Sequence, residues 1–149
     1  MVMQPEQVEQ LRALLHNMDA CARNIEHIAE RERQAAHLLD ADALANLSDL
    51  RTLSHQALAD MEQQTRKLLA RCGAPADMPL GTFIDMHTPQ GHNDLQALRR
   101  NLYQRLLLVQ KNDNETRLHL KASNDVAVGI LQHIGAIEPK QTYSPRGTT

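Results

Sequence analysis

The sequence predicts an all-α protein with a long antiparallel helical hairpin, a third long helix and a mobile C-terminal tail. Apolar residues recur every three or four positions along most of the 149 residues, which is the period of an amphipathic helix. Glycine and proline, which disfavour helix interiors, are absent from 6–72 and from 92–128. Hydrophobic residues make up 42% of the chain but aromatic residues only 2%, so the predicted core is aliphatic.

The first helix is predicted over residues 5–39. Pro5 suits a first helical turn, and Glu6 suits the positive end of the helix dipole. The apolar stripe of this helix has spacings of three, four and seven residues. It consists of Val8, Leu11, Leu15, Met18, Ala22, Ile25, Ala29, Ala36 and Leu39.

The second helix is predicted over 43–72, since either Asp40 or Asp42 can cap its start and Gly73 can end it. Two long helices joined by so short a connection must be antiparallel neighbours. The apolar residues of this second helix are Leu44, Leu47, Leu50, Leu53, Leu58, Met61, Leu68 and Leu69.

A breaker-rich loop is predicted over 73–91, in which Phe83 and Ile84 fold back as a plug over the end of the bundle. A third helix is predicted over 92–136. Its apolar rhythm continues in phase but turns polar across 112–116. A helix of this length must overhang the hairpin, bend near 111–114, or pair with another chain as a homo-oligomer.

Residues 1–137 are therefore expected to form a single helical bundle domain, and 138–149 a flexible tail too polar to bury. Charge is uneven within this domain and tail. Residues 1–62 carry five basic and eleven acidic side chains, whereas 63–149 carry eleven basic and seven acidic ones. We interpret this as an acidic hairpin that helps to hold a basic third helix. The basic excess is too dilute to predict a nucleic-acid partner.

The sequence also predicts where the protein works. No apolar run approaches about 18 residues, so membrane insertion is not expected. The first residues contain neither a basic region nor an apolar one of the kind that forms a leader, so a cytoplasmic protein is expected. Cys21 and Cys72 lie too far apart in an antiparallel hairpin to form a disulfide, so two reduced thiols are predicted.

Sequence motifs for catalysis are missing. His16, His27 and His37 share a broad face of the first helix, but no Glu-x-x-His pair is present to aim two ligands at one ion. The chain has no phosphate-binding glycine-rich loop, no Gly-x-Ser-x-Gly and no Cys-x-x-Cys. We therefore expect no enzymatic activity, no metal and no cofactor.

One motif offers an alternative of a different class. Residues 118–123 resemble the active helix of histidine phosphotransfer domains, in which a lysine follows the histidine by three residues. Here Lys121 follows His119 by only two, which places it roughly 200° around the helix from the imidazole. Phosphotransfer through His119 therefore remains an unfavoured alternative.

The polar interruption at 112–116 has two interpretations. It is either an exposed part of an overhanging helix, or a sign that the third helix is incompletely covered by its own hairpin. In the second case the helix would lend its apolar rows to a helix of another protein. The candidate client-binding residues are Leu106, Val109, Leu120, Ile130 and Ile134.

The end of the chain resembles the FlgN-type flagellar export chaperones. It has the leucine-rich segment 106–109, the polar segment 110–114, an amphipathic stretch of the right length, and a closing Thr142-Tyr143 followed by Gly147. Two positions differ from the family pattern: Glu115 follows Asn114 where the family often has glycine, and Ser144 replaces the glycine after the tyrosine. Overall length, two preceding long helices and the shortage of aromatic residues agree with the family as well.

The resemblance implies a cytoplasmic chaperone of flagellar type III secretion. Such proteins bind the C-terminal amphipathic helices of the hook–filament junction proteins FlgK and FlgL, prevent their premature assembly and deliver them to the export gate protein FlhA. By position, the third helix would hold the client and Tyr143 would dock to the gate. A structural coiled-coil adaptor without cargo remains the alternative, because it would have the same bundle.

Overall fold

The computed structural model describes residues 2–89, 91–116 and 121–135, with backbone alone for 114–116 and 121–127. Within these residues the chain is entirely helical apart from turns and loops, which confirms the predicted all-α class. There are two long helices, one short helix and two helices of intermediate length. They are α1 (Pro5–His37), α2 (Ala41–Arg71), α3 (Leu80–His87), α4 (Asp94–Thr116) and α5 (Lys121–Gly135).

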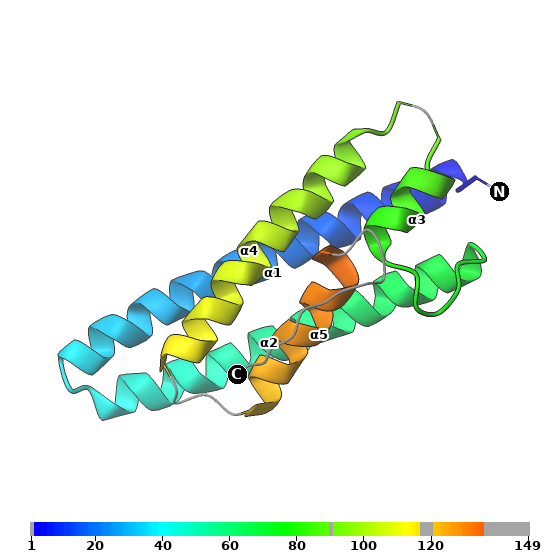
Figure 1. Ribbon diagram of the computed structural model, residues 1–149. Helices are drawn as coiled ribbons and strands as arrows, with labels where there is room; N and C mark the ends of the chain where they lie inside the picture. The colour runs from blue at the N-terminus through cyan, green and yellow to red at the C-terminus, as the bar shows by residue number, and fades with distance from the viewer. Residues whose placement is uncertain (1, 90, 117–120, 136–149) are drawn as a thin grey trace.

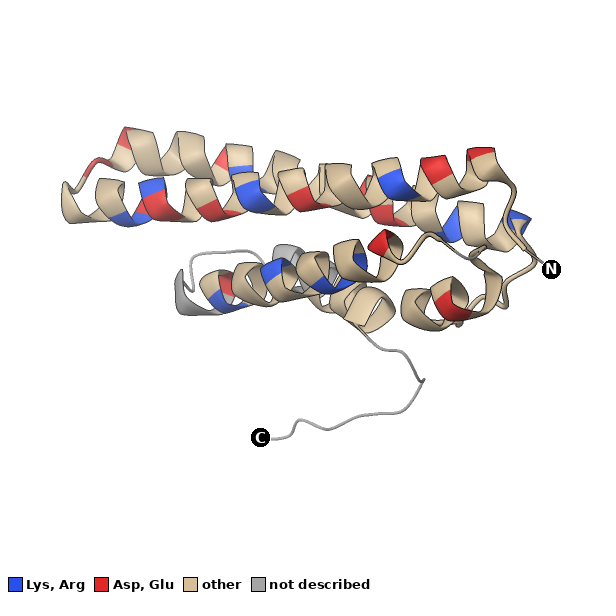
Figure 2. Ribbon diagram, turned by 90° about the horizontal axis from the view of Figure 1, so that it is seen from above, with Lys and Arg blue, Asp and Glu red and all other residues tan. Residues whose placement is uncertain are grey.

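The described helices form two layers (Figures 1 and 2). The antiparallel hairpin of α1 and α2 is one layer, and α3, α4 and α5 make up the other. Helix α4 packs on α1, and α5 packs on both α4 and α2. Figure 1 shows that the α1–α2 turn extends past the last turn of α4, so the tip of the hairpin projects beyond the second layer.

Local sequence explains where the long helices begin and end. Pro5 opens α1, and the side chain of Asp40 caps α2 by accepting a hydrogen bond from the Ala43 amide at 3.0 Å. Both helices end in a Schellman turn, in which the residue after the C-cap adopts a left-handed conformation. This residue is Gly73 after α2, with φ of 89°, but Leu39 after α1, with φ of 54°.

The main core lies between the layers. It unites buried aliphatic residues of α1 with Leu58, Leu68 and Leu69 of α2 and with residues from all three helices of the second layer. A second, small apolar cluster of Ile28, Ala35 and Leu47 fills the tip of the hairpin. The stripe predicted for α1 is buried from Val8 to Ala29, whereas Ala36 and Leu39 at its end are exposed.

The predicted third helix over 92–136 is replaced by two helices. Since α4 and α5 pack against each other, the chain reverses direction between Thr116 and Lys121 instead of continuing straight. Reversal lets both helices bury apolar residues on the hairpin, which a single overhanging helix could not do. The predicted loop 73–91 contains α3, whose Phe83 and Ile84 are buried in the main core, as expected of a plug.

The apolar stripe predicted for α2 is partly wrong. Leu50 and Leu53 are 44% and 66% exposed, while Arg51 and His55 are buried in their place. Both cysteines are free thiols, as expected, and burial raises the pKa of Cys21 and of Cys72. Across the described ranges, no helix combines the length and the apolar character that crossing a membrane requires.

Candidate functional site

The buried residues of α1 form a row along that helix, and those of α2 form another. We call these rows the α1 seam and the α2 seam, and they differ in polarity. Among ten buried residues of α1, Glu32 alone is charged or polar. Among eight buried residues of α2, four are polar or charged: Arg51, His55, Glu62 and Thr65. Buried polar groups stabilise less than aliphatic groups and need specific partners. Polar and charged side chains are therefore concentrated in the α2 seam, where each needs a specific partner.

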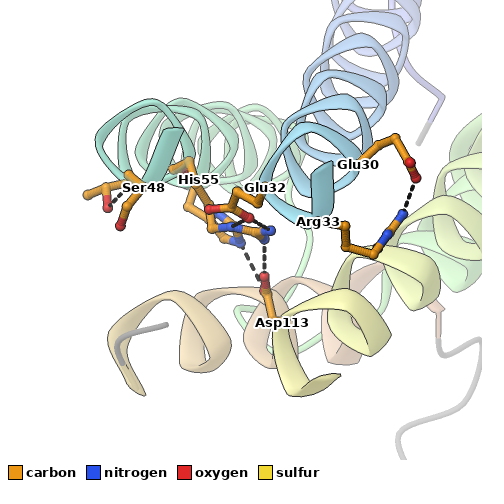
Figure 3. Close-up of polar contacts among 8 residues, drawn as sticks. Glu30, Glu32, Arg33, Ser48, His55 and Asp113 are labelled. Carbon is orange, nitrogen blue, oxygen red and sulfur yellow. Dashed lines mark hydrogen bonds and ion pairs between the residues drawn. The ribbon is translucent and has the colours of Figure 1, made fainter. Parts of the chain in front are cut away.

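Arg51 occupies the centre of a buried ionic cluster and is only 1% exposed. Its Nε and Nη2 donate to Oε1 of Glu32 at 3.1 and 2.5 Å, and its Nη1 donates to Oδ1 of Asp113 at 2.5 Å. Glu32 lies on α1 and Asp113 on α4, so the guanidinium joins three helices. Figure 3 shows Glu32, His55 and Asp113 converging on this point.

His55 completes the cluster. Its Nδ1 donates to the carbonyl oxygen of Arg51 at 3.0 Å, and its Nε2 lies 3.0 Å from Oδ2 of Asp113. A carbonyl oxygen and a carboxylate both accept, so the geometry requires a proton on each ring nitrogen or one on the Asp113 carboxyl. With that proton each of these contacts among the four groups has both a donor and an acceptor.

Along α2, the ionic cluster lies between residues of the two apolar clusters. Leu47 of the tip cluster precedes Arg51 and His55, and Leu58 of the main core follows them. On α1, Glu32 lies within the tip cluster, between Ile28 and Ala35. The four residues of the ionic cluster include no serine or cysteine nucleophile. Within the described residues, no group of three His, Cys, Asp or Glu side chains is arranged to hold a metal ion. The cluster therefore joins the two layers of helices through buried ion pairs and hydrogen bonds.

Helix α5 contacts α2 through charged side chains and lies beside it through apolar ones. His133 Nδ1 lies 2.8 Å from Oε2 of Glu62, a close ion-pair distance without the angles of a hydrogen bond. The same carboxylate oxygen lies 2.5 Å from Nε of Arg66. Around this polar contact, Ile130 and Ile134 enter the main core. The α2–α5 interface thus combines two buried isoleucines with a half-buried charge network.

The C-terminal end of α5 is tied to α4 by Arg99. This side chain is 3% exposed, and its Nη1 donates to the carbonyl oxygens of Ile134 at 2.8 Å and of Gly135 at 3.3 Å. Burial lowers the pKa of Arg99. A Cβ at Gly135 would fall 2.1 Å from a ring carbon of Tyr103, so the close approach of α5 to α4 requires glycine here.

Ion pairs on the surface fasten α4 to α1. Arg105 of α4 donates to Asp19 and to Glu26 of α1, each at 2.7 Å, as the charge distribution predicts. The hydrogen bond to Glu26, and next the one to Asp19, raise the pKa of Arg105. In a further ion pair the basic residue comes from the hairpin: Arg12 of α1 pairs with Asp94 of α4 at 2.7 Å. Ion pairs of both orientations therefore join α4 to α1.

The predicted client-binding residues do not form a free groove. Leu106, Val109, Ile130 and Ile134 are all buried in the main core, at 3% exposure or less. The prediction of an uncovered third helix is wrong for this conformation, because the reversal of the chain turns the α4 and α5 rows onto the hairpin. Leu120, the gate-docking Tyr143 and His119 of the phosphotransfer alternative lie outside the described residues.

Sequence reasoning missed Arg51, His55 and Glu32 as a site. The available signal was a pair of polar residues four apart on α2, at positions that continue the phase of Leu47 and Leu58. Asp113 was within the polar interruption that the sequence did single out. What no local pattern supplies is that these residues, far apart in the chain, are partners.

Comparisons of the chain with protein-family models, with curated proteins and with solved structures found no match.

Proposed function

We propose that this protein is a cytoplasmic export chaperone of the FlgN type, which binds C-terminal amphipathic helices of FlgK and FlgL and presents them to FlhA. The observation that carries the proposal is the contact between α2 and α5, where the charged Glu62 of α2 faces His133 of α5. A helix that leaves an aliphatic surface exposes only apolar groups to water. When α5 leaves Glu62, water solvates the exposed carboxylate, so separation costs less.

We propose that α5 separates from α2 when a client binds. In the closed form Ile130 and Ile134 are covered, and a client helix has no access to them. Once α5 moves away, these isoleucines and the apolar residues of the α2 seam become available together. A client with an exposed apolar stripe then takes over the contacts that α2 and α5 made with each other, which requires no ATP chemistry.

A reversible cross-link between α2 and α5 tests this step. Glu62→Cys and His133→Cys place two thiols where the native side chains meet, in a Cys21→Ala/Cys72→Ala background, and a reducible bis-maleimide joins them. We expect the linked protein to bind a C-terminal FlgK fragment at least tenfold more weakly in isothermal titration calorimetry. Reduction of the linker should restore binding.

A matched cross-link supplies the control. Glu26→Cys/Arg105→Cys joins α1 to α4 at another ion pair and leaves α5 free, so the FlgK fragment should bind as it does to the unlinked protein. Equal binding by the α2–α5-linked form would place the client elsewhere. Failure of every form to bind would reject the chaperone and leave the structural adaptor.

Gate docking has a separate test. Tyr143→Ala should leave binding of the FlgK fragment unchanged and weaken binding to the cytoplasmic part of FlhA, measured with the chaperone–client complex. An unchanged affinity for FlhA would remove Tyr143 from the proposal.

A further inference from the structure

The outward side of α2 carries a second row of residues that nothing in the described structure covers. Its apolar members are Leu50, Leu53 and Ala57, and Asn46 precedes them in the same phase; we call these four the outer row. Their spacing of four, three and four residues is that of a helix seam in a coiled coil, where a single asparagine fixes register. At 100° per residue the row lies roughly 120° around α2 from the polar seam, on the side away from α5.

The two borders of the outer row differ in charge. Along one border lie the exposed carboxylates of Asp42, Asp49 and Asp60. Between residues 41 and 65 the basic side chains of α2 are Arg51 and His55, and both are buried, so this surface offers no cation from α2. Along the other border, Asn24 of α1 donates to Ser54 at 3.1 Å, which is an uncharged contact.

The acidic border is only partly explained by the fold. Asp42 lies in the first turn of α2, where a carboxylate suits the helix dipole. Asp60 accepts a hydrogen bond from Gln56 at 3.1 Å. In the described part of the chain, neither Asp42 nor Asp49 forms an ion pair. Asp49 and Asp60 stand in the middle of α2, where a carboxylate gains nothing from the dipole.

We propose that the outer row docks an amphipathic helix whose apolar side is flanked by lysine or arginine. Leu50 and Leu53 would supply the apolar contact, while Asp49 and Asp60 would pair with the flanking cations of the partner. A second copy of this chain fits less well, because antiparallel pairing of two α2 helices sets one acidic border against the other. The surface is distinct from the α2 seam proposed for the flagellar client.

A model peptide tests the charge and the apolar contact separately. The probe is a fluorescent three-heptad helix with leucine at the a and d positions and lysine at e and g, and its counterpart has glutamate at e and g. Like charges at e and g keep each peptide from pairing with itself. In fluorescence anisotropy at low salt, we expect the lysine peptide to bind the full chain at least tenfold more tightly than the glutamate peptide.

Three variants locate the site. Leu50→Asp/Leu53→Asp should weaken binding of the lysine peptide at least tenfold, and Asp49→Lys/Asp60→Lys should reverse the preference between the peptides. Leu107→Asp/Leu108→Asp is the matched control, because these α4 leucines are 36% and 48% exposed on another surface, and it should bind as the wild type does. Circular dichroism checks that each variant is helical.

Other results would overturn the inference. They are equal binding of the two peptides, an equal loss in the α4 control, or an unchanged preference in Asp49→Lys/Asp60→Lys, a variant that keeps every apolar residue. A wild-type dimer in analytical ultracentrifugation that Leu50→Asp/Leu53→Asp dissociates would assign the row to a second copy instead. Because the probe is no flagellar client, failure of the FlgK fragment to bind would leave this result untouched.

Discussion

His55 Nε2 lies 3.0 Å from Oδ2 of Asp113, a residue 58 positions further along the chain. The contact ties the middle of α2 to the last turns of α4, at the place where the chain is about to reverse. Because His55 Nδ1 is already directed at a carbonyl oxygen, the contact with Asp113 depends on a shared proton.

Asparagine at position 113 removes the need for that proton. Its amide nitrogen can donate to Nε2 of a neutral ring while its oxygen accepts from Arg51. We therefore expect Asp113→Asn to change the free energy of unfolding by no more than about 1 kcal/mol. Asp113→Leu leaves Arg51 and His55 short of an acceptor and should cost about 3 kcal/mol. Urea unfolding of both variants measures the difference; equal losses would show that charge, not hydrogen bonding, holds the cluster.

Arg99 is expected to control the anchoring of α5. Arg99→Met removes the charged donor from the carbonyl oxygens of Ile134 and Gly135 while keeping an apolar stem. A hydrogen bond from a charged group contributes about 1.5–3 kcal/mol. Hydrogen exchange at the amides of 130–134 should accelerate by about tenfold to a hundredfold, with α1 unchanged. An equal acceleration in α1 would mean global destabilisation instead.

Leu39 occupies a position that favours glycine. A left-handed conformation costs a residue with a Cβ roughly 1–2 kcal/mol, and the Leu39 side chain is 88% exposed, so little packing offsets this cost. Leu39→Gly should therefore raise the free energy of unfolding by about 1 kcal/mol, after allowance for the freer unfolded chain. Gly73→Leu, at the equivalent position after α2, is the reverse control and should destabilise the protein.

The ion pair of Asp94 with Arg12 predicts a dependence on pH. The hydrogen bonds and charge of Arg12 hold the pKa of Asp94 below its ordinary value of 3.8. A carboxyl with a lowered pKa in the folded state stabilises the protein above its ordinary pKa, and this contribution is lost as the pH falls through the lower value. The wild type should thus be more stable than Asp94→Asn at neutral pH, and the difference should shrink as the pH falls through the lowered pKa of Asp94. Thermal unfolding across this range measures it; a constant difference would indicate that the ion pair contributes nothing.

The sequence predicted the hairpin well because its signals are local. Pro5 and Asp40 mark helix starts that need no distant partner, and a helix period can be counted directly. A bend near 111–114 was only one of three alternatives for the third helix, since no glycine or proline stands between 92 and 128 to indicate a turn, and the observed break lies a few residues later, between Thr116 and Lys121. The competing signal there was a continuous apolar phase, which two packed helices satisfy as well as one.

The candidate site was harder to predict from the sequence, for a different reason. On α2, Leu50 and Leu53 have the same spacing as core residues, and only the tertiary structure shows that Arg51 and His55 are buried instead. An arginine becomes a core residue when acceptors arrive from elsewhere, here from α1 and α4. Hydrophobicity scales treat each residue alone, so they assign these positions to the surface.

The projecting tip of the hairpin has a consequence for how the protein unfolds. Its apolar cluster consists of Ile28, Ala35 and Leu47 together with the partly buried Ala43 and Leu44, and on α2 the buried Arg51 and His55 lie between this cluster and Leu58 of the main core. Such an end can fray as a unit of its own while the body stays intact, with slow exchange in the body and fast exchange at the tip. Binding of a partner to the tip would therefore raise its order without disturbing the rest of the bundle.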